Sequence, residues 1–199
     1  MPGTVEFWFE FASTYSYPAA MRIEPLARGA GVTLVWRPFL LGPIFAGQGW
    51  RDSPFNIYPA KGRYMWRDLD RICERLGVPL RRPSQFPRNG LLPARVATAA
   101  AAAPWMADFV RGVYHANFAD DRDIAQRDVM SALLTTLGID AEPWLEQAAS
   151  EAVKGQLRAS TDEAMAVGIF GAPTMRVGDE LFWGNDRVEE AIAWARRGR

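Results

Sequence analysis

The chain has 199 residues, of which 49% are hydrophobic, and its 23 Lys and Arg residues balance 23 Asp and Glu residues. A chain of this length can bury most of its apolar surface, as one large domain or as a compact core with an inserted subdomain. Balanced charge disfavours nucleic acid and anionic membranes as partners. The chain starts without a basic leader or a long apolar stretch, so we expect a cytoplasmic protein.

A single cysteine, Cys73, and a single histidine, His115, restrict the chemistry. A lone cysteine excludes an internal disulfide, and one Cys with one His does not make an ordinary structural zinc site. Cys73 falls on an apolar helix face with Leu69, Ile72 and Leu76, which favours a buried, inert thiol over a nucleophile. We interpret His115 as structural or as a surface residue. We expect no metal site, and any redox chemistry needs an external thiol.

The first third of the chain predicts a β-α-β unit. Residues 5–11 alternate acidic with aromatic and β-branched side chains, which is typical of a strand. A helical pattern follows from Tyr15 to Ala30 and ends at glycines. Residues 32–38 predict a second strand that ends at a proline. Because a helix joins the two strands, we expect them to be parallel with a right-handed crossover.

The middle of the chain changes from an irregular stretch to helices. Glycines and prolines are frequent between residues 39 and 59, and a long irregular segment in a compact domain usually serves a site. Helical patterns then cover residues 61–76, 91–103, 104–118 and 124–137, and a further run from Pro143 to residue 168.

The last section returns to strands. Residues 174–177 and 180–183, separated by Gly178-Asp179, predict a β-hairpin. Residues 187–197 predict a terminal helix.

The predicted fold class is α/β. The element order β-α-β, helices, β-β-α, with Pro173 just before the third strand, is that of a thioredoxin-like fold with an α-helical domain inserted in its middle. Residues 1–59 and 169–199 would form the thioredoxin-like domain, and residues 60–168 the inserted helical domain.

The corner where the first strand meets the first helix reads Ser13-Thr14-Tyr15-Ser16. In a thioredoxin-like site, the free N–H groups and dipole of this helix start favour an anion such as a thiolate. Redox members place two cysteines at this spacing, whereas this chain has serines and cannot perform dithiol exchange. The hydroxyl of Ser13 can still hydrogen-bond a sulfur, and it can also act merely as a helix cap.

Residues 168–174 resemble the loop in which thioredoxin-like proteins hold a cis-proline beside the helix start. The backbone of Ala172 would then be free to pair with a bound peptide. Taken alone, Pro173 is more readily interpreted as a trans proline at a strand entrance. The serine corner and this loop occur in the right order, with the right elements between them, which favours the cis-proline.

Along nearly its whole length, the chain resembles the family that joins 2-hydroxychromene-2-carboxylate isomerases with kappa-class glutathione transferases. The matching stretches are residues 9–17, 36–38, 59–65, 170–174 and 182–187.

The resemblance implies glutathione as the cofactor. Ser13 would donate a hydrogen bond that stabilises the glutathione thiolate, and Tyr15 belongs to the same cofactor-binding motif. Ala172, followed by Pro173, would pair through its backbone with the cysteinyl unit.

The resemblance also assigns residues to the two ends of glutathione. Asn185 and Asp186 would hold the γ-glutamyl end, although both are good N-caps for the terminal helix. Lys61 would face a carboxylate of glutathione or substrate, although such a lysine is often a solvated charge. The family tends to have Gly-Asn where this chain has Gly49-Trp50. The nearest asparagine, Asn56, is therefore assigned in its place.

The chain also departs from the family at Thr14, where proline is common; this changes the helix entrance but keeps the Ser13 hydroxyl. A flat substrate would need an aromatic pocket. The candidates, which can equally be core residues, are Phe39, Trp50, Tyr58 and Phe86.

The activity that the resemblance implies is isomerisation of 2-hydroxychromene-2-carboxylate to trans-o-hydroxybenzylidenepyruvate, a reaction of aromatic-compound degradation. Reversible addition of the glutathione thiolate removes a double bond, rotation follows, and elimination gives the product. Two alternatives stay open: a kappa-class-like glutathione transferase that conjugates an electrophile, and a non-catalytic thiol- or peptide-binding module. The expected partner is a small aromatic carboxylate, and a homodimer is compatible with the family.

Overall fold

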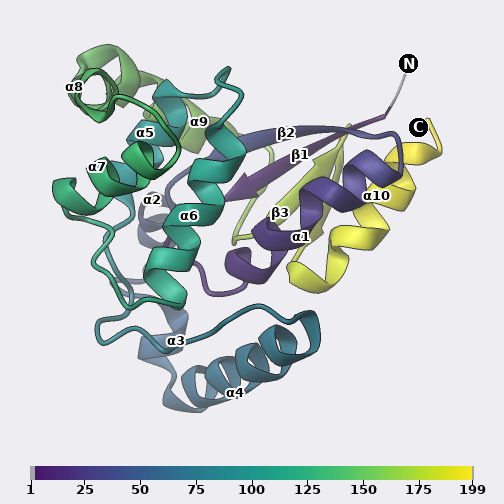
Figure 1. The fold of residues 1–199 in the computed structure, drawn as a ribbon. Helices are drawn as coiled ribbons and strands as arrows, with labels where there is room; N and C mark the ends of the chain where they lie inside the picture. Colours follow the sequence, from purple (N-terminus) through teal and green to yellow (C-terminus); the bar gives the residue numbers. More distant parts are fainter. Residues whose placement is uncertain (1–2, 199) are drawn as a thin grey trace.

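The N-terminal strand, β1 (Thr4–Phe9), lies inside a mixed sheet. In this computed structural model, the described residues 3–198 form a four-stranded sheet with the order β2-β1-β3-β4 (Figure 1). β2 (Thr33–Pro38) is parallel to β1. β3 (Thr174–Val177) is antiparallel to β1, and β4 (Glu180–Trp183) is antiparallel to β3. The predicted β-α-β unit and hairpin are confirmed.

β1 is buried on both faces because it has a neighbour on each side and helices above and below. Phe7 stands opposite Trp36 of β2, and the two rings meet edge-on with centroids 5.2 Å apart. Trp8 points to the other face, as the alternation of a strand requires. There it packs in a second cluster with Phe39 and Ile44.

Helices cover the sheet on both faces. α1 (Ser16–Gly29) and α10 (Val188–Arg196) lie side by side on one face, and α10 follows the short 3-10 turn η1 (Asn185–Arg187) (Figure 1). The remaining helices follow β2 and precede β3 along the chain. They are α2 (Leu41–Gly47), α3 (Pro54–Ile57), α4 (Pro59–Leu76), α5 (Leu91–Ala99), α6 (Met106–Phe118), α7 (Arg127–Thr136), α8 (Ala141–Ala149) and α9 (Glu151–Ala166). This order confirms the thioredoxin-like fold with a helical insertion.

The stretch from residue 39 to 59 is not irregular as expected, since it contains α2 and α3. α2 forms because Ile44 is buried against the second cluster. α3 begins at Pro54, whose fixed backbone angle suits a first helical position, and the Ser53 hydroxyl accepts the Phe55 N–H at 3.3 Å. Prolines and glycines in this stretch therefore mark helix starts as well as turns.

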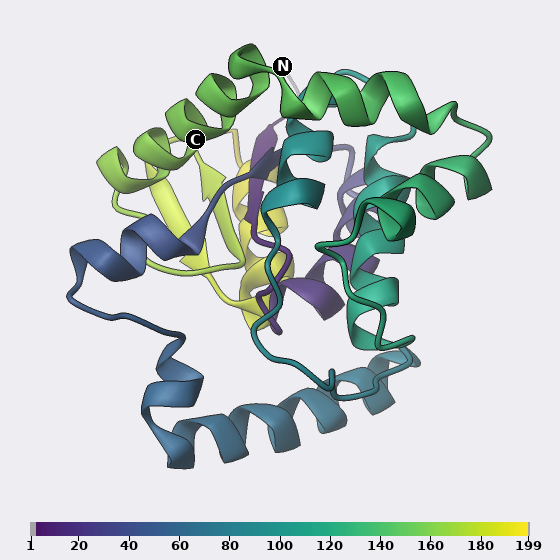
Figure 2. The same ribbon diagram turned by 90° about the vertical axis from the view of Figure 1, so that its left-hand side faces the viewer.

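α3 and α4, which we call the α3–α4 arm, lie apart from the sheet (Figure 2). The buried face of α4, with Leu69 and Cys73, joins the main core. Tyr17 of α1 donates its hydroxyl to the Pro79 carbonyl just after the arm, at 2.5 Å. The arm is thus attached along one side of α4.

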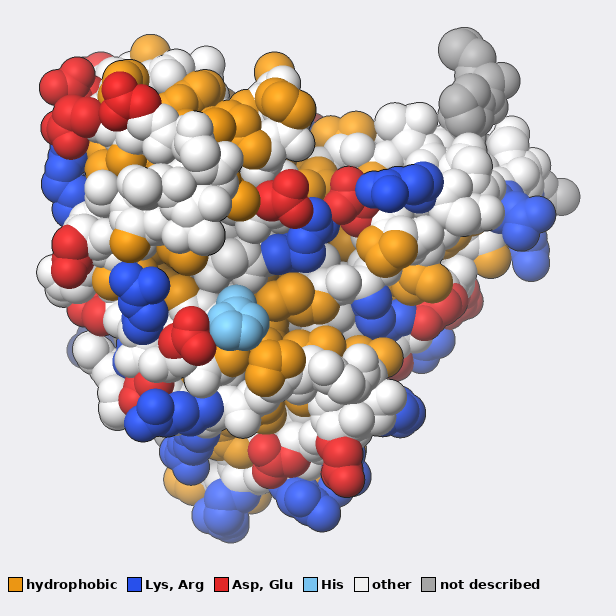
Figure 3. All heavy atoms as spheres, in the orientation of Figure 1, with side chains coloured by type: hydrophobic (Ala, Val, Ile, Leu, Met, Phe, Trp, Pro, Cys, Tyr) orange, Lys and Arg blue, Asp and Glu red, His pale blue; other side chains and the backbone are white. Residues whose placement is uncertain are grey.

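The surface carries both signs of charge. Figure 3 shows Lys and Arg side chains interspersed with Asp and Glu over one face, in agreement with the balanced composition. Within residues 3–198, no helix combines the length and apolar character needed to span a bilayer.

Candidate active site

A cleft of about 1910 Å³ separates the end of the sheet from the α3–α4 arm. Its other walls are the turn after β1, the segment before α5, the proline loop and the turn before α10. The predicted site residues that line it are Ser13, Tyr15, Lys61, Ala172, Asn185 and Asp186. Among the described residues, Asn56 and Pro173 do not line it. The fold therefore gathers most of the predicted site from distant parts of the chain.

Ser13 lies in the tight turn between β1 and α1. Its N–H donates to the Glu10 carbonyl at 3.1 Å, which closes the turn. Its hydroxyl donates to the Ala172 carbonyl at 2.9 Å, whereas the Ser16 N–H is 3.4 Å away, a long distance for a cap. The N-cap position of α1 is Tyr15, which makes no side-chain capping bond. The Ser13 hydroxyl thus faces the proline loop more than the helix.

The Ala172–Pro173 peptide bond is cis, as the resemblance implies. The Ser13–Ala172 hydrogen bond joins residues that are 159 positions apart, so the helix start and the proline loop form one site. Across the described part of the chain, the Ala172 N–H has no recorded hydrogen-bond partner. This N–H is available as a donor to a ligand in extended conformation.

Two half-exposed aromatic residues flank the proline loop. The rings of Phe170 and Trp183 are 5.0 Å apart between centroids, and both residues line the cleft. Between them in space, a Cβ added at Gly171 would lie 2.5 Å from the Trp183 indole nitrogen. Only glycine allows this approach, so the loop sequence fixes the position of the Trp183 ring beside Ala172.

Asn185 and Asp186 do not cap the terminal helix. No side-chain capping bond is present at the start of η1 or α10. Instead, the Asn185 amide oxygen accepts the Arg22 Nε–H at 3.2 Å, and Arg22 also binds the Asn185 carbonyl and Glu189. Asn185 is buried, whereas 75% of the Asp186 side chain is exposed to the cleft side of the molecule. The capping alternative is therefore wrong, because Arg22 takes the amide that would cap.

Tyr15 and Lys61 both line the cleft. The Tyr15 hydroxyl donates to the Asp68 carboxylate of α4 at 3.0 Å, and burial together with this carboxylate raises the pKa of the phenol. Its hydroxyl holds the arm while its ring, 6.2 Å from that of Phe55, faces the cleft. Lys61 is exposed at the start of α4, with Nζ 5.0 Å above the Tyr58 ring.

The assignment of Asn56 to the cofactor site is not supported by its position. Its amide nitrogen lies 3.1 and 3.2 Å from the two Asp52 carboxylate oxygens and 3.3 Å from the Phe86 carbonyl. Both acceptor residues line the cleft, whereas Asn56 itself does not. Trp50, the residue at the family's asparagine position, lines the cleft and packs on Phe45 at 5.6 Å.

The four aromatic candidates for a substrate pocket divide between the cleft and the core. Trp50 and Phe86 line the cleft. Phe39 is fully buried against Trp8, with ring centroids 6.1 Å apart, and belongs to the core. Tyr58 is exposed beside Lys61 and is not part of the described cleft wall.

Glu10 is a cleft residue that the sequence interpretation missed. It follows β1 directly and is buried, with 7% of its surface exposed. Its Oε2 accepts the Ala12 N–H at 2.9 Å. Burial raises the pKa of the Glu10 carboxyl to about 7, and the N–H groups of Ala12 and Ser13 only partly oppose this rise. The available signal was an acidic residue at the end of an apolar strand.

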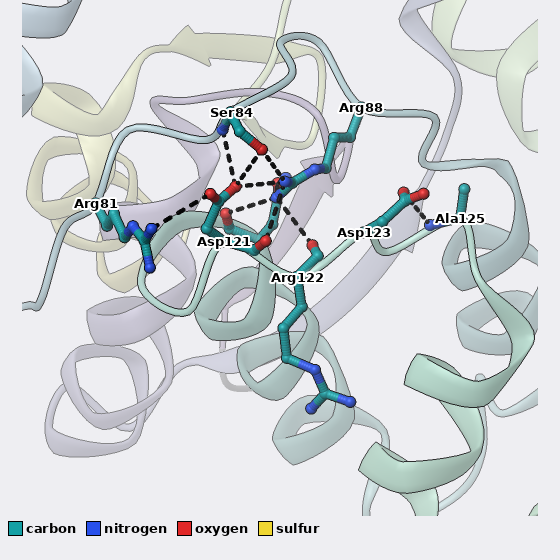
Figure 4. Close-up of polar contacts among 8 residues, drawn as sticks. Arg81, Ser84, Arg88, Asp121, Arg122, Asp123 and Ala125 are labelled. Atoms are coloured by element: carbon teal, nitrogen blue, oxygen red, sulfur yellow. Dashed lines mark hydrogen bonds and ion pairs between the residues drawn. The ribbon is translucent and has the colours of Figure 1, made fainter.

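Arg88, which also lines the cleft, organises the irregular segment before α5. Figure 4 shows Arg81, Ser84 and Arg88 directed towards Asp121. Arg88 is 5% exposed and donates to Asp121, to the Arg122 carbonyl at 2.9 Å and to the Asn117 carbonyl at 3.3 Å.

The Arg88 cluster also reaches the turn before Ser13. The Asn117 amide donates to the Phe11 carbonyl at 3.1 Å. The Ser84 N–H and hydroxyl donate to Asp121 at 2.8 and 3.0 Å. Hydrogen bonds from the Ser84 N–H and from Arg88 lower the pKa of Asp121 to about 2. Sequence reasoning missed this cluster, because its members have no shared spacing or motif.

Cys73 and His115 lie outside the site. Cys73 is buried, as predicted, and burial raises the pKa of its thiol to about 11, which favours the neutral form. His115 is exposed on α6, with Nδ1 3.2 Å from Asp120, as expected for a surface residue.

The comparisons with known proteins decide the family. The family model described as the DSBA-like thioredoxin domain matches residues 4–192. The chain belongs to this family.

Within the DsbA-like family, the similar proteins are enzymes. The chain is 32% identical to 2-hydroxychromene-2-carboxylate isomerase of Sphingobium xenophagum, over 95% of this chain and 96% of that protein. It is 29% identical to glutathione S-transferase kappa 2 of Caenorhabditis elegans, over 94% of this chain and 88% of that protein. A solved structure of 2-hydroxychromene-2-carboxylate isomerase has a TM-score of 0.88 at 26% identity, covering 98% of this chain and 95% of that chain. The resemblance inferred from the motifs is confirmed.

Proposed function

We propose that this chain is a glutathione-dependent isomerase that converts 2-hydroxychromene-2-carboxylate to trans-o-hydroxybenzylidenepyruvate, a step of aromatic-compound degradation. The observation that carries the proposal is the Ser13–Ala172 hydrogen bond, because it joins a hydroxyl, a helix start and a cis-proline backbone at one point of the cleft. The names of the similar isomerases and kappa-class transferases support the same activity and cofactor.

The residues at this point fit a tripeptide thiol. The Ala172 N–H and carbonyl offer a peptide-like edge. The Thr14 hydroxyl lines the cleft, is buried and has no hydrogen-bond partner among residues 3–198, so the helix start retains polar capacity for a ligand. We assign the γ-glutamyl end to Asn185 and Asp186. Asn56 is not part of the proposal.

Glutathione would supply a sulfur nucleophile that adds reversibly to the conjugated substrate. The helix start favours the thiolate over the thiol, and the Ser13 hydroxyl does so once its proton turns from the Ala172 carbonyl to the sulfur. Both raise the reactive fraction near neutral pH. Lys61 offers a cation to a carboxylate, and the aromatic rings of Trp50 and Phe86 give the cleft flat apolar walls. The Tyr15–Asp68 hydrogen bond holds the arm that carries Lys61.

One assay separates the proposed isomerase from its two rivals. Protein, glutathione and the chromene are mixed, and absorbance and free thiol are followed together. An isomerase requires glutathione and leaves it unconsumed. Consumption of thiol would indicate a transferase, and no change in either signal would indicate a binding module.

Removing the Ser13 hydroxyl tests the residue that carries the proposal. We expect Ser13→Ala to lower kcat by about 10²-fold, the effect of losing one preorganised donor to a developing or resident anion. The fold should be kept, because the hydroxyl is at the surface of the cleft. Ser131→Ala on α7, remote from the cleft, is the matched control. An unchanged rate in Ser13→Ala overturns the assignment.

A further inference from the structure

Glu10 presents a carboxyl group to the cleft that the proposed mechanism does not use. Its Oε2 is held by the Ala12 N–H at 2.9 Å, one residue before Ser13. Among residues 3–198, no hydrogen bond reaches its Oε1; the nearby Ser13 N–H, which helps to lower the pKa of this carboxyl, donates to the Glu10 main-chain carbonyl at 3.1 Å. A Cβ added at Gly90 would lie 2.7 Å from Oε1, so the carboxyl fills the space between the serine turn and the segment before α5. Glu10, Ala12, Ser13 and Gly90 all line the cleft.

The groups packed around Glu10 do not neutralise it. From α6, the Tyr114 hydroxyl donates at 2.9 Å to the Glu10 main-chain carbonyl and not to the carboxyl. From the segment before α5, Arg88 directs its guanidinium to Asp121 and main-chain carbonyls. Within the described residues, no ion pair joins Glu10 to a cation, and no charged group contributes to its pKa.

A purely structural role explains only one of the two oxygens of the Glu10 carboxyl, Oε2. Bonding the Ala12 N–H with one oxygen stabilises the turn, as a short polar side chain would also do. Burying an ionisable group without a cation is unfavourable, and such groups are concentrated at functional sites. The second oxygen, which makes no hydrogen bond within residues 3–198, is the part that needs a functional explanation.

We propose that Glu10 is a catalytic residue that gives a proton to the substrate in the cleft and takes it back. The proposal rests on the proposed function, in which a sulfur nucleophile adds to the ring-opened chromene. Opening breaks the bond between C2 and the ring oxygen, moves the hemiketal proton to that oxygen to give a phenol, and leaves a conjugated ketone. As the S–C bond forms, the π electron pair of the substrate moves towards its carbonyl oxygen. The Glu10 proton is transferred to that oxygen, which leaves a carboxylate.

The return step uses the same group. After rotation about the former double bond, the Glu10 carboxylate removes the proton from the oxygen. The carbon–carbon double bond re-forms, and the S–C bond breaks with its electron pair returning to sulfur. Protons and electrons balance over the cycle, and no oxidant or reductant is needed. Burial suits Glu10 to both directions, because the pKa of its carboxyl is raised to about 7 and both protonation states are populated near neutral pH.

The variant Glu10→Gln keeps the shape of the side chain and removes the transferable proton. We expect kcat to fall by about 10²-fold or more, within the range for loss of a general acid or base. KM for glutathione should stay near its wild-type value. The fall of kcat at alkaline pH, which follows ionisation of Glu10, should be absent from the variant. Glu146→Gln on the exposed face of α8 is the matched control and should leave kcat unchanged.

A second measurement does not depend on glutathione. Infrared spectra of the wild type and of Glu10→Gln are recorded, and their difference is taken in the C=O stretching region of a protonated carboxyl. This band should be present at pH 5.5 and absent at pH 8.5, because burial raises the pKa of Glu10 to about 7. Wild-type kcat in Glu10→Gln, or a difference spectrum without this band at pH 5.5, would overturn the role of Glu10.

Failure of the proposed function has a different signature. If the wild type consumes thiol instead of isomerising the chromene, the isomerase assignment fails. The comparison with Glu10→Gln is then made on the rate of addition, and a reduced rate still supports proton transfer by Glu10. A wild type that neither isomerises nor conjugates overturns both proposals.

Discussion

Asp121 is a partly exposed carboxyl and Glu10 is a buried one, and their pKa values shift in opposite directions. Asp121 receives hydrogen bonds from the Ser84 N–H, the Ser84 hydroxyl and Arg88, and its pKa falls to about 2. Glu10 receives the Ala12 N–H and no cation, and burial raises its pKa to about 7.

The difference shows that burial without a cation raises the pKa of a carboxyl, whereas hydrogen-bond donors that bind the carboxylate lower it. The Arg88 cluster binds a carboxylate as an anion and thereby fixes an irregular segment of the chain. The cleft leaves the Glu10 carboxyl without a cation, which is unfavourable for stability but makes a proton available at neutral pH. Three measurements test this contrast, in decreasing order of expected effect.

The largest effect is expected from removing the cation of the cluster. Arg88→Met should lower the free energy of unfolding by about 3–5 kcal/mol, because Asp121 and several carbonyls lose their buried donor. Denaturant unfolding measures the change. Arg158→Met, on the exposed face of α9, is the control and should alter stability little. A small loss in Arg88→Met would mean that the cluster does not hold this segment.

At the cleft, replacing the carboxyl of Glu10 is expected to raise the free energy of unfolding, in contrast to the loss in Arg88→Met. The folded pKa of Glu10, about 7, lies above its ordinary value of 4.5, so the folded state binds more protons than the unfolded state between these values. The free energy of unfolding therefore falls as pH rises from 4.5 to 7. Glu10→Gln should be more stable than the wild type by about 3 kcal/mol at pH 8, since one pKa unit corresponds to about 1.4 kcal/mol. The gain should vanish below pH 4.5 in urea titrations.

A smaller loss of stability, which depends on pH, is expected when the carboxylate of Asp121 is removed. The folded pKa of Asp121, about 2, lies below its ordinary value of 3.8, so its stabilisation is complete above pH 3.8 and is lost as pH falls towards 2. Asp121→Asn should be less stable than the wild type at pH 7, and the difference should shrink between pH 4 and pH 2. Thermal unfolding across this range measures it, with Asp162→Asn as the exposed control. A difference that is independent of pH would contradict the role of the carboxylate charge.

Much of the fold could be predicted from local patterns. The alternation in residues 5–11 and the spacing of Met65, Leu69 and Ile72 each report how one element buries an apolar face. Short helices at residues 41–47 and 54–57 could not be predicted, because they depend on capping and on a cluster assembled by α9.

The site also contains residues that local motifs predict and residues that only tertiary contacts reveal. Ser13 and Pro173 could be predicted because they belong to contiguous motifs. Asn56 was assigned to the cofactor site, but it does not line the cleft, and Asp52 and the Phe86 carbonyl bind its amide. Arg22 and Arg88 were missed. Arg22 binds a residue 163 positions away and Arg88 binds one 33 positions away, and sequence spacing does not distinguish such arginines from solvated ones.

By itself, the sequence determined the order of the strands and the longer helices, the absence of a second cysteine and the serine at the helix start. These are local properties of spacing, propensity and residue type. Only the tertiary structure decided that Ser13 meets Ala172, that Arg22 takes the Asn185 amide, and that Glu10 lies buried beside the cleft without a cation. Hydrogen bonding and pKa depend on which groups share a small volume, and chain folding alone sets that neighbourhood.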